Sequence, residues 1–197
     1  MRTTGTTIAS WWLNELSTPS DVEERLLASG LRRIESDYLL DGLLLTIAPP
    51  PADPGVTARR VADAAEFIAA TEAQYEAFAT PADQRHNEAA LTEQFAVQRT
   101  SDVDVHYTAW LDGRLAGYAR AMFSPRGVFM AGGSTLPWAR GRGAYRALVR
   151  VRWDDAVARG TPALAVSAGP MSAPILRRLG FETVCRFRRI QDVLSPL

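Results

Sequence analysis

The chain has 197 residues, of which 47% are hydrophobic and 22% are charged, and its formal net charge is zero. These values are ordinary for a globular protein and provide no bulk field that would draw the chain onto nucleic acid or anionic lipid. Because Cys185 is the only cysteine and His86 and His106 are the only histidines, an intrachain disulfide is excluded and no metal site is expected. No apolar run approaches the ~20 residues of a membrane span and no signal sequence is recognisable, so we expect a cytoplasmic protein.

The first 48 residues are predicted to form a small strand–helix–strand extension. Residues 11–13 are bulky and apolar, which is typical of a short strand. Ser20 and Glu23 have the spacing of a capping box, which predicts a helix from there to about Ser29. Gly30 follows, where helices often end in a left-handed residue. The apolar run 39–47 predicts a second strand.

Residues 49–55 are predicted to be a linker, because four of the seven are proline and the last is glycine. Proline has no backbone N–H to donate to a helix or an interior strand. The sequence therefore divides into an extension (1–48), a proline-rich linker (49–55) and a larger domain (56–197).

The larger domain is predicted to be a mixture of strands and helices without strict alternation. Phe67, Thr71, Tyr75 and Phe78 share one face of a helix, and Pro81 is expected to start a second helix that carries Leu91 and Phe95. Asp112-Gly113 is a hairpin turn between strands 105–111 and 115–123. The remaining elements are strands 56–61, 128–136, 163–167 and 181 onward, and helices reaching about 159 and spanning 173–179.

A small-residue loop with two arginines joins strand 128–136 to the next helix. Gly141 and Gly143 lack a β-carbon, so an anion can approach the main chain, and consecutive amides beside a helix start attract anions. Arg140 and Arg142 can add charge-assisted hydrogen bonds. Taken alone, the loop is weak evidence for a phosphate site, and the alternative is a sharp turn carrying solvated arginines. It is not a P-loop, since the chain contains no lysine.

The loop resembles the coenzyme A loop of the GNAT superfamily of N-acetyltransferases, whose signature is R/Q-x-x-G-x-G/A. Arg140 to Tyr145 match it except at Tyr145, where the family has a small residue. A second block, 172–181, resembles the family's later helix ending in a Gly-Phe pair. The resemblance covers about residues 56–195. It implies an α/β (mixed α+β) GNAT acyl-CoA N-acyltransferase fold with a central, mostly antiparallel, splayed sheet.

The resemblance also implies a co-substrate and residues that hold it. The co-substrate would be acetyl-CoA, and its pyrophosphate would bind the amides of Arg140, Gly141, Arg142, Gly143, Ala144 and Tyr145. The pantetheine arm would pair with Ser134, Thr135 and Leu136, beside a neighbouring strand that splays away. A backbone N–H in this stretch would polarise the acyl carbonyl, and an amine would attack the thioester directly.

The proton donor and base that many relatives use have no counterpart here. Leu176 stands where they have a tyrosine, and Gly169 where they often have an asparagine. Ser172 is one candidate to donate a proton to the sulfur, although the pattern favours its alternative role as a cap of the helix before Pro174. His106 is a candidate base near neutral pH. Strand alternation places His106 and Tyr107 on opposite faces, whereas Tyr118 can face either the core or a cleft.

Three functions remain open at this point. The sequence favours an N-acetyltransferase that transfers the acetyl group of acetyl-CoA directly to an amine of a small molecule or peptide. The first alternative is a non-catalytic acyl-CoA-binding or regulatory module, and the second is an acyltransferase for proteins or longer acyl chains. We expect a monomer or homodimer that binds neither nucleic acid nor membrane. The extension, with its helix–Gly–strand order, is interpreted as a degenerate half of an acetyltransferase that binds no coenzyme A.

Overall fold

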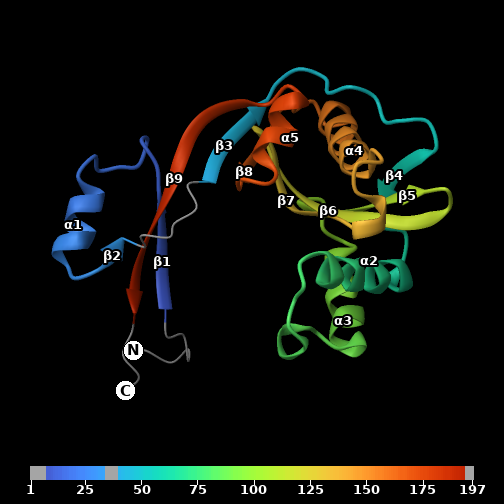
Figure 1. Ribbon diagram of the computed structural model, residues 1–197, viewed down its shortest axis with the longest axis horizontal. Helices are drawn as coiled ribbons and strands as arrows, with labels where there is room; N and C mark the ends of the chain where they lie inside the picture. Colours follow the sequence, from blue (N-terminus) through green and yellow to red (C-terminus); the bar gives the residue numbers. More distant parts are fainter. Residues whose placement is uncertain (1–7, 34–39, 194–197) are drawn as a thin grey trace. The chain divides into compact units, whose positions relative to one another are not determined.

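The computed structural model in Figure 1 describes residues 8–33 and 40–193. The chain divides into two compact units, which we describe separately. One comprises Met1–Leu44 together with Ser167–Leu197, and the other comprises Leu45–Val166. Within the described ranges, no helix has both the length and the apolar character needed to cross a membrane.

The unit formed by Leu45–Val166 contains a sheet with helices on both faces. In this unit α2 and α3 lie on one side of the sheet and α4 on the other (Figure 1). The strand order is β8-β7-β6-β5-β4, and all neighbours are antiparallel except β7 and β8. The elements are β4 (Val56–Arg60), α2 (Ala64–Ala77), the 3-10 turn η1 (Ala82–Gln84), α3 (Glu88–Gln98), β5 (Asp104–Leu111), β6 (Arg114–Ser124), β7 (Gly127–Thr135), the 3-10 turn η2 (Pro137–Ala139), α4 (Ala144–Ala158) and β8 (Leu164–Ala168).

The β5–β6 hairpin has the predicted Asp-Gly turn. Asp112 and Gly113 have φ angles of 52° and 75°, the left-handed pair that a two-residue hairpin requires. Alternation along β5 then sends Tyr107 toward α4, where its hydroxyl donates to Asp155 at 2.6 Å. Thr108 faces α2, where its hydroxyl donates to Glu66 at 2.5 Å. His106 is two residues before Thr108, so it lies on the same face of β5, where it packs on Phe67. It therefore lies on the face opposite Tyr107, as predicted.

The sheet is splayed at β7, and this prediction is confirmed. The parallel ladder between β7 and β8 has only two pairs, Val128 with Leu164 and Phe129 with Ala165. β7 also contains a bulge, because its pairing with β6 steps from Ser134 opposite Tyr118 to Ala131 opposite Arg120. Gly132 and Gly133 therefore face a single β6 residue. Gly132 has φ +58°, a backbone conformation that glycine adopts without strain.

Two predicted features of this unit are wrong. Pro81 does not begin the second long helix: it precedes η1, and α3 begins only after Asn87, whose side chain accepts the Ala90 N–H at 2.9 Å. An asparagine side chain accepts a hydrogen bond from an N–H group at the helix start, whereas a proline side chain has no acceptor. The helix therefore begins after Asn87 and not six residues earlier at Pro81. Phe78, expected on the buried face of α2, follows the last helical residue and is 55% exposed.

The unit formed by the two ends of the chain is built around β9. Its elements are β1 (Ile8–Leu13), α1 (Val22–Ala28), β2 (Arg32–Arg33), β3 (Leu40–Leu45), α5 (Ala173–Arg178) and β9 (Glu182–Val193). β9 pairs antiparallel with β3 along its first half and with β1 along its second half, and β2 also pairs with it. The predicted strand–helix–strand order of the extension is confirmed for residues 8–33 and 40–45; residue 39 of the second predicted strand lies outside the described residues.

The start of α1 differs from the capping-box prediction. Asp21 occupies the capping position and makes no side-chain cap. Glu23 pairs instead with Arg33 and Arg188, so the carboxylate that would complete the box is used in ion pairs. The end of α1 is as predicted: Gly30 has φ +90° and Leu31 N–H donates to Leu26 O at 3.1 Å.

Candidate functional site: the end of strand β7

The loop after β7 turns through two left-handed glycines into α4. Gly141 has φ +74°, and Gly143, the residue immediately before α4, has φ +87°. A residue with a β-carbon would pay about 1–2 kcal/mol at either position. Gly141 is exposed and Gly143 is half-buried, so the turn presents its main chain at the surface.

Two of the six amides that were expected to hold a pyrophosphate donate within the loop. Arg140 N–H donates to Pro137 O and Arg142 N–H donates to Ala139 O, both at 3.3 Å. The amides of Ala144 and Tyr145 belong to the first turn of α4, where an α-helix provides no acceptors of its own. Together with the helix dipole, these first-turn amides are the part of the loop best suited to an anion.

A carboxylate from the linker lies at this helix start, and the sequence did not predict it. Asp53 forms an ion pair with Arg146 in the first turn of α4. A β-carbon placed on Gly143 would collide with the Asp53 carboxylate. One turn further along α4, Arg150 Nη1 donates to Pro49 O at 3.1 Å. The linker therefore runs beside the first two turns of α4, with an acidic group where the helix end attracts negative charge.

The loop arginines are held by neighbouring groups. The Arg142 guanidinium lies 5.7 Å from the Trp138 ring centre and pairs with Asp112 at 3.1 Å. Arg114 lies over the same ring at 4.4 Å. Trp138 thus packs between two arginine side chains. Arg140 folds back and donates to Thr135 O at 3.5 Å.

The last residues of β7 present a free backbone edge. Leu136 N–H donates to Ala116 O at 2.9 Å across the β6 side. Because hydrogen-bonding direction alternates along an antiparallel strand, the N–H and C=O of Thr135 face the other side, where β7 has no strand partner within residues 8–33 and 40–193. The Thr135 hydroxyl is buried and, among the residues that the structure describes, has no hydrogen-bond partner. Ser134 is buried, and its hydroxyl donates weakly to Tyr118 O at 3.5 Å.

A cavity of about 270 Å³ lies beneath α2 and α3, against the β7 bulge. We call it the bulge cavity, and it is lined by Phe67, Thr71, Gln74, Tyr75, His86, Gln94, His106, Tyr118, Arg120, Ala131 and Gly132. The sequence did not predict its boundaries, because its wall combines residues from five separate elements and the loop that carries His86. Gln74 Nε2 donates to Gly132 O at 2.9 Å, which ties α2 to the bulge.

His106 and Tyr118 form a hydrogen-bonded pair in this cavity, with His106 Nδ1 and the Tyr118 hydroxyl oxygen 2.5 Å apart. Burial lowers the pKa of His106 to about 4, so the imidazole is neutral at pH 7. Burial also raises the pKa of the Tyr118 hydroxyl, which stays protonated. His106 Nε2 lies 3.7 Å from Asp104 Oδ1 and has no hydrogen-bond partner in the described ranges. If Nε2 carries the imidazole proton, that proton is near the Asp104 carboxylate, and Nδ1 is then the atom that accepts the hydrogen bond from the Tyr118 hydroxyl.

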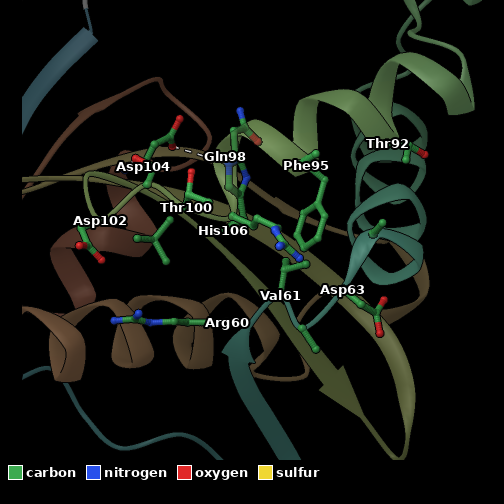
Figure 2. Close-up of a pocket in the computed structure, with 16 residues that line it drawn as sticks. Arg60, Val61, Asp63, Thr92, Phe95, Gln98, Thr100, Asp102, Asp104 and His106 are labelled. Atoms are coloured by element: carbon green, nitrogen blue, oxygen red, sulfur yellow. Dashed lines mark hydrogen bonds and ion pairs between the residues drawn. The ribbon is translucent and has the colours of Figure 1, made fainter.

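His106 also lines a larger cavity of about 880 Å³. Figure 2 shows Val61, Phe95 and His106 around it, with Arg60 and Asp102 nearby. None of the residues that line it comes from β7 or from the Gly141–Gly143 turn, and His106 is the only described residue that it shares with the bulge cavity. Despite its size, it is therefore the less suitable place for chemistry at the β7 edge.

Comparison with solved structures identifies this arrangement. No protein-family model and no curated protein sequence matches the chain. A GCN5-related N-acetyltransferase from Kribbella flavida superposes with a TM-score of 0.69 at 21% identity, over 94% of this chain and 68% of that one. A GCN5-related N-acetyltransferase from Sphaerobacter thermophilus gives 0.72 at 18% identity, over 96% and 60%. The chain has the GNAT fold.

A third similar structure is a tandem GNAT protein from the clavulanic acid biosynthesis pathway, with a TM-score of 0.67 at 16% identity over 97% of this chain and 65% of that one. The chain thus spans 60% to 68% of the length of these three proteins. The fold class predicted from the sequence is confirmed.

Within the GNAT fold, the predicted catalytic residues lie on different parts of the chain. His106 lines the bulge cavity. Ser172 belongs to the unit formed by the chain ends, where it precedes α5 and its hydroxyl donates to Gly169 O at 3.4 Å. Leu176 is fully buried. In the part of the chain that the structure describes, no group of three or more His, Cys, Asp or Glu side chains can hold a metal ion.

Tyr145, the departure from the GNAT loop signature, packs against the bulge. Its ring Cε2 would lie 3.0 Å from a β-carbon on Gly133, so the glycine makes room for it. Burial raises the pKa of the Tyr145 hydroxyl, and nearby Arg152 opposes that rise. Tyr145 therefore places a large side chain where the motif has a small residue, and this side chain fits beneath α4.

Proposed function

We propose that the protein is an N-acetyltransferase that transfers the acetyl group of acetyl-CoA directly to an amine of a small molecule or peptide. The observation that carries the proposal is the free edge of β7 at Thr135, which lies six residues before Gly141, the first of the two glycines that lead into α4. A strand edge can pair with an extended amide chain, and the helix start can bind phosphate. A thiol carrier with both an amide-containing arm and a diphosphate fits this combination.

The loop would bind the diphosphate through the first-turn amides of α4, assisted by Arg146. In this structure Arg146 pairs with Asp53, so the Asp53 side chain would have to move away from Arg146 when a phosphate binds. Thr135 would exchange hydrogen bonds with the arm, and its carbonyl would exchange the long contact with Arg140 for an amide donor. These residues supply binding and orientation, which bring the reacting atoms together.

The proton transfers would use residues around the bulge. Attack by the amine nitrogen on the thioester carbon forms the C–N bond and breaks the C–S bond, so one proton must leave nitrogen and one must reach sulfur. We assign the first to Tyr118 and His106: the Tyr118 hydroxyl takes the proton as its own passes to His106 Nδ1, over the 2.5 Å hydrogen bond. We assign the second to Tyr145, whose ring lies against Gly133. Ser172 stays an alternative donor.

Thiol release from acetyl-CoA across a panel of amines, with thermal shift by CoA measured in parallel, tests the proposal. We expect both stabilisation by CoA and amine-dependent release of thiol. Stabilisation without turnover of any amine would instead support a non-catalytic acyl-CoA-binding module, and no stabilisation would remove the CoA assignment. Tyr145→Phe should lower kcat and leave CoA affinity unchanged; Ser172→Ala, tested beside it, distinguishes the two proposed donors.

A further inference from the structure

In the part of the chain with described coordinates, the walls of the bulge cavity carry no carboxylate. Its charged and titratable lining side chains are two imidazoles, two phenols and Arg120. An alkylamine is an ammonium ion near neutral pH, as lysine is with its pKa of about 10.4. Burying such a cation without a counter-charge is costly, so this cavity disfavours a charged acceptor.

Three carboxylates on neighbouring elements, Asp104, Glu66 and Glu72, are already paired. Asp104 accepts two hydrogen bonds from Arg120, at 2.5 and 2.6 Å. On α2, Glu66 pairs with Arg59 at 2.6 Å and Glu72 lies 3.9 Å from Arg85. None of these acids is free to receive an ammonium. By the same pairing, Arg120 offers no unmatched charge to the carboxylate of an amino acid acceptor.

The base in the cavity is too weak for an alkylammonium ion. Burial lowers the pKa of His106 to about 4, and its Nδ1 is the acceptor nearest to Tyr118. An imidazole of this strength cannot hold a proton taken from an ammonium that ionises near 10. It can take a proton from nitrogen after attack, when the nitrogen carries a full positive charge and its N–H is strongly acidic.

The shape of the cavity favours a flat ring. Phe67 and His106 meet edge to face, with centroids 5.1 Å apart and planes at 86°, and Tyr118 lies nearly parallel to His106 at 5.8 Å. Aromatic walls bind rings through offset and edge contacts. A volume of about 270 Å³ lies just below the range of about 300–1,000 Å³ for ligand pockets, so the cavity suits only a small acceptor.

Resting on the proposed acetyl transfer, we infer that the acceptor is a small aromatic amine, or an equally planar and weakly basic nitrogen such as an aryl hydrazine, which enters the bulge cavity uncharged. The lone pair of such a nitrogen is partly delocalised, so the nitrogen is unprotonated near pH 7 and needs no base before attack. The aryl N–H proton then passes through Tyr118 to His106 as the C–N bond forms, and the thiolate released when the C–S bond breaks takes its proton from the Tyr145 hydroxyl to leave as free CoA.

The test compares three acceptors of similar size at pH 7.5: aniline, benzylamine and phenylalanine. The readout is kcat/KM from thiol release with acetyl-CoA. We expect aniline to exceed the other two by at least about tenfold, a difference that corresponds to excluding one uncompensated charge. Equal or better turnover of benzylamine or phenylalanine would overturn the inference and leave acetyl transfer standing. Turnover of none of a broad amine panel would overturn both.

A variant that adds a carboxylate to the wall gives an independent readout. Gln94→Glu is nearly isosteric and places a negative charge at the cavity, so kcat/KM for benzylamine relative to aniline should rise about two- to fivefold. Gln84→Glu adds the same charge to η1, outside the cavity lining, and should leave the ratio unchanged. An unchanged ratio in Gln94→Glu, or the same rise in both variants, would count against recognition by charge in this cavity.

Discussion

Gly141 and Gly143 have the same kind of backbone conformation but different surroundings. Both have positive φ, yet a β-carbon on Gly141 meets no atom within 4 Å, whereas one on Gly143 meets the Asp53 carboxylate. We therefore expect Gly143→Ala to weaken CoA binding by at least about tenfold and Gly141→Ala by no more than about threefold. Both variants carry the cost of a left-handed alanine, so their comparison isolates access to the start of α4. Isothermal titration with CoA measures it, and equal losses would refute the assignment of Gly143.

Asp53 is expected to compete with phosphate for Arg146 and for the start of α4. Asp53→Asn removes the charge and keeps the shape, so CoA should bind about two- to fivefold more tightly. Asp154→Asn is the matched control, because Asp154 pairs with Arg150 at 2.8 Å on the same helix and does not contact the loop. Weaker CoA binding in Asp53→Asn would show that Asp53 helps to build the site.

His106 should make stability depend on pH in a defined window. The unfolded imidazole binds a proton below pH 6.5, whereas burial delays protonation in the folded protein to about pH 4. The unfolded state binds more protons between these values, so the free energy of unfolding falls as pH drops from 6.5 to 4, by up to about 3 kcal/mol. Urea denaturation across this range, for wild type and His106→Gln, measures it. Carboxylates contribute equally to both proteins, so identical slopes would contradict the expectation.

At the scale of single residues, the sequence predicted the face on which a side chain lies better than the residues that it contacts. It placed His106 opposite Tyr107 because strand alternation is a local rule. It did not place Asp53 at the start of α4, since that contact joins residues about ninety positions apart. The Tyr118–His106 pair depends on the register between β5 and β6, which shifts by one residue between Ala109 and Trp110, and the Asp112-Gly113 turn does not predict that shift.

Strand β7 should show its free edge in amide exchange. Leu136 N–H is bonded to Ala116 O, whereas Thr135 N–H faces the side that β8 leaves. We expect the Thr135 amide to exchange at least about tenfold faster than the Leu136 amide, and to become protected when CoA is added. Hydrogen exchange followed by NMR measures both. Slow exchange at Thr135 without CoA would mean that the edge is already covered.

The sequence correctly predicted the elements that have a strong local signal. It did not predict elements for which it allows more than one helix start or strand pairing. The Asp112-Gly113 turn and the glycines before α4 require left-handed residues that few other sequences provide. By contrast, Pro81 and Asn87 are both acceptable helix starts, and the choice of Asn87 became visible only in the folded chain. The β7 bulge was missed because an inserted glycine alters pairing without altering the apolar pattern.

At the scale of the whole molecule, the extension takes part in the sheet of the chain-end unit. β9 pairs with β3 over Glu182–Phe187 and with β1 over Arg188–Val193, so its described strand partners are all N-terminal. The composition break at the linker indicated a boundary, and the proposed origin as a degenerate half-unit stays a prediction. Amino-acid composition indicates where a linker separates two segments of the chain. It does not predict that Leu43 and Ile190, from different segments, are buried in the same unit.

Removing residues 1–48 should therefore destabilise the protein rather than release an independent domain. Without β1 and β3, the long strand β9 exposes backbone donors and acceptors on both sides, and such an edge promotes aggregation. We expect residues 49–197 alone to be insoluble or to unfold at least about 10 °C below the full chain, since 1 kcal/mol corresponds to roughly 2–4 °C at this size. Leu43→Ala in the full chain, which empties a 1% exposed position in β3, tests the same packing with less disruption and should cost about 2–5 kcal/mol. Scanning calorimetry compares the three proteins. A truncated chain with full solubility and unchanged melting would establish 49–197 as an autonomous domain, and the extension would then need a role other than completing a sheet.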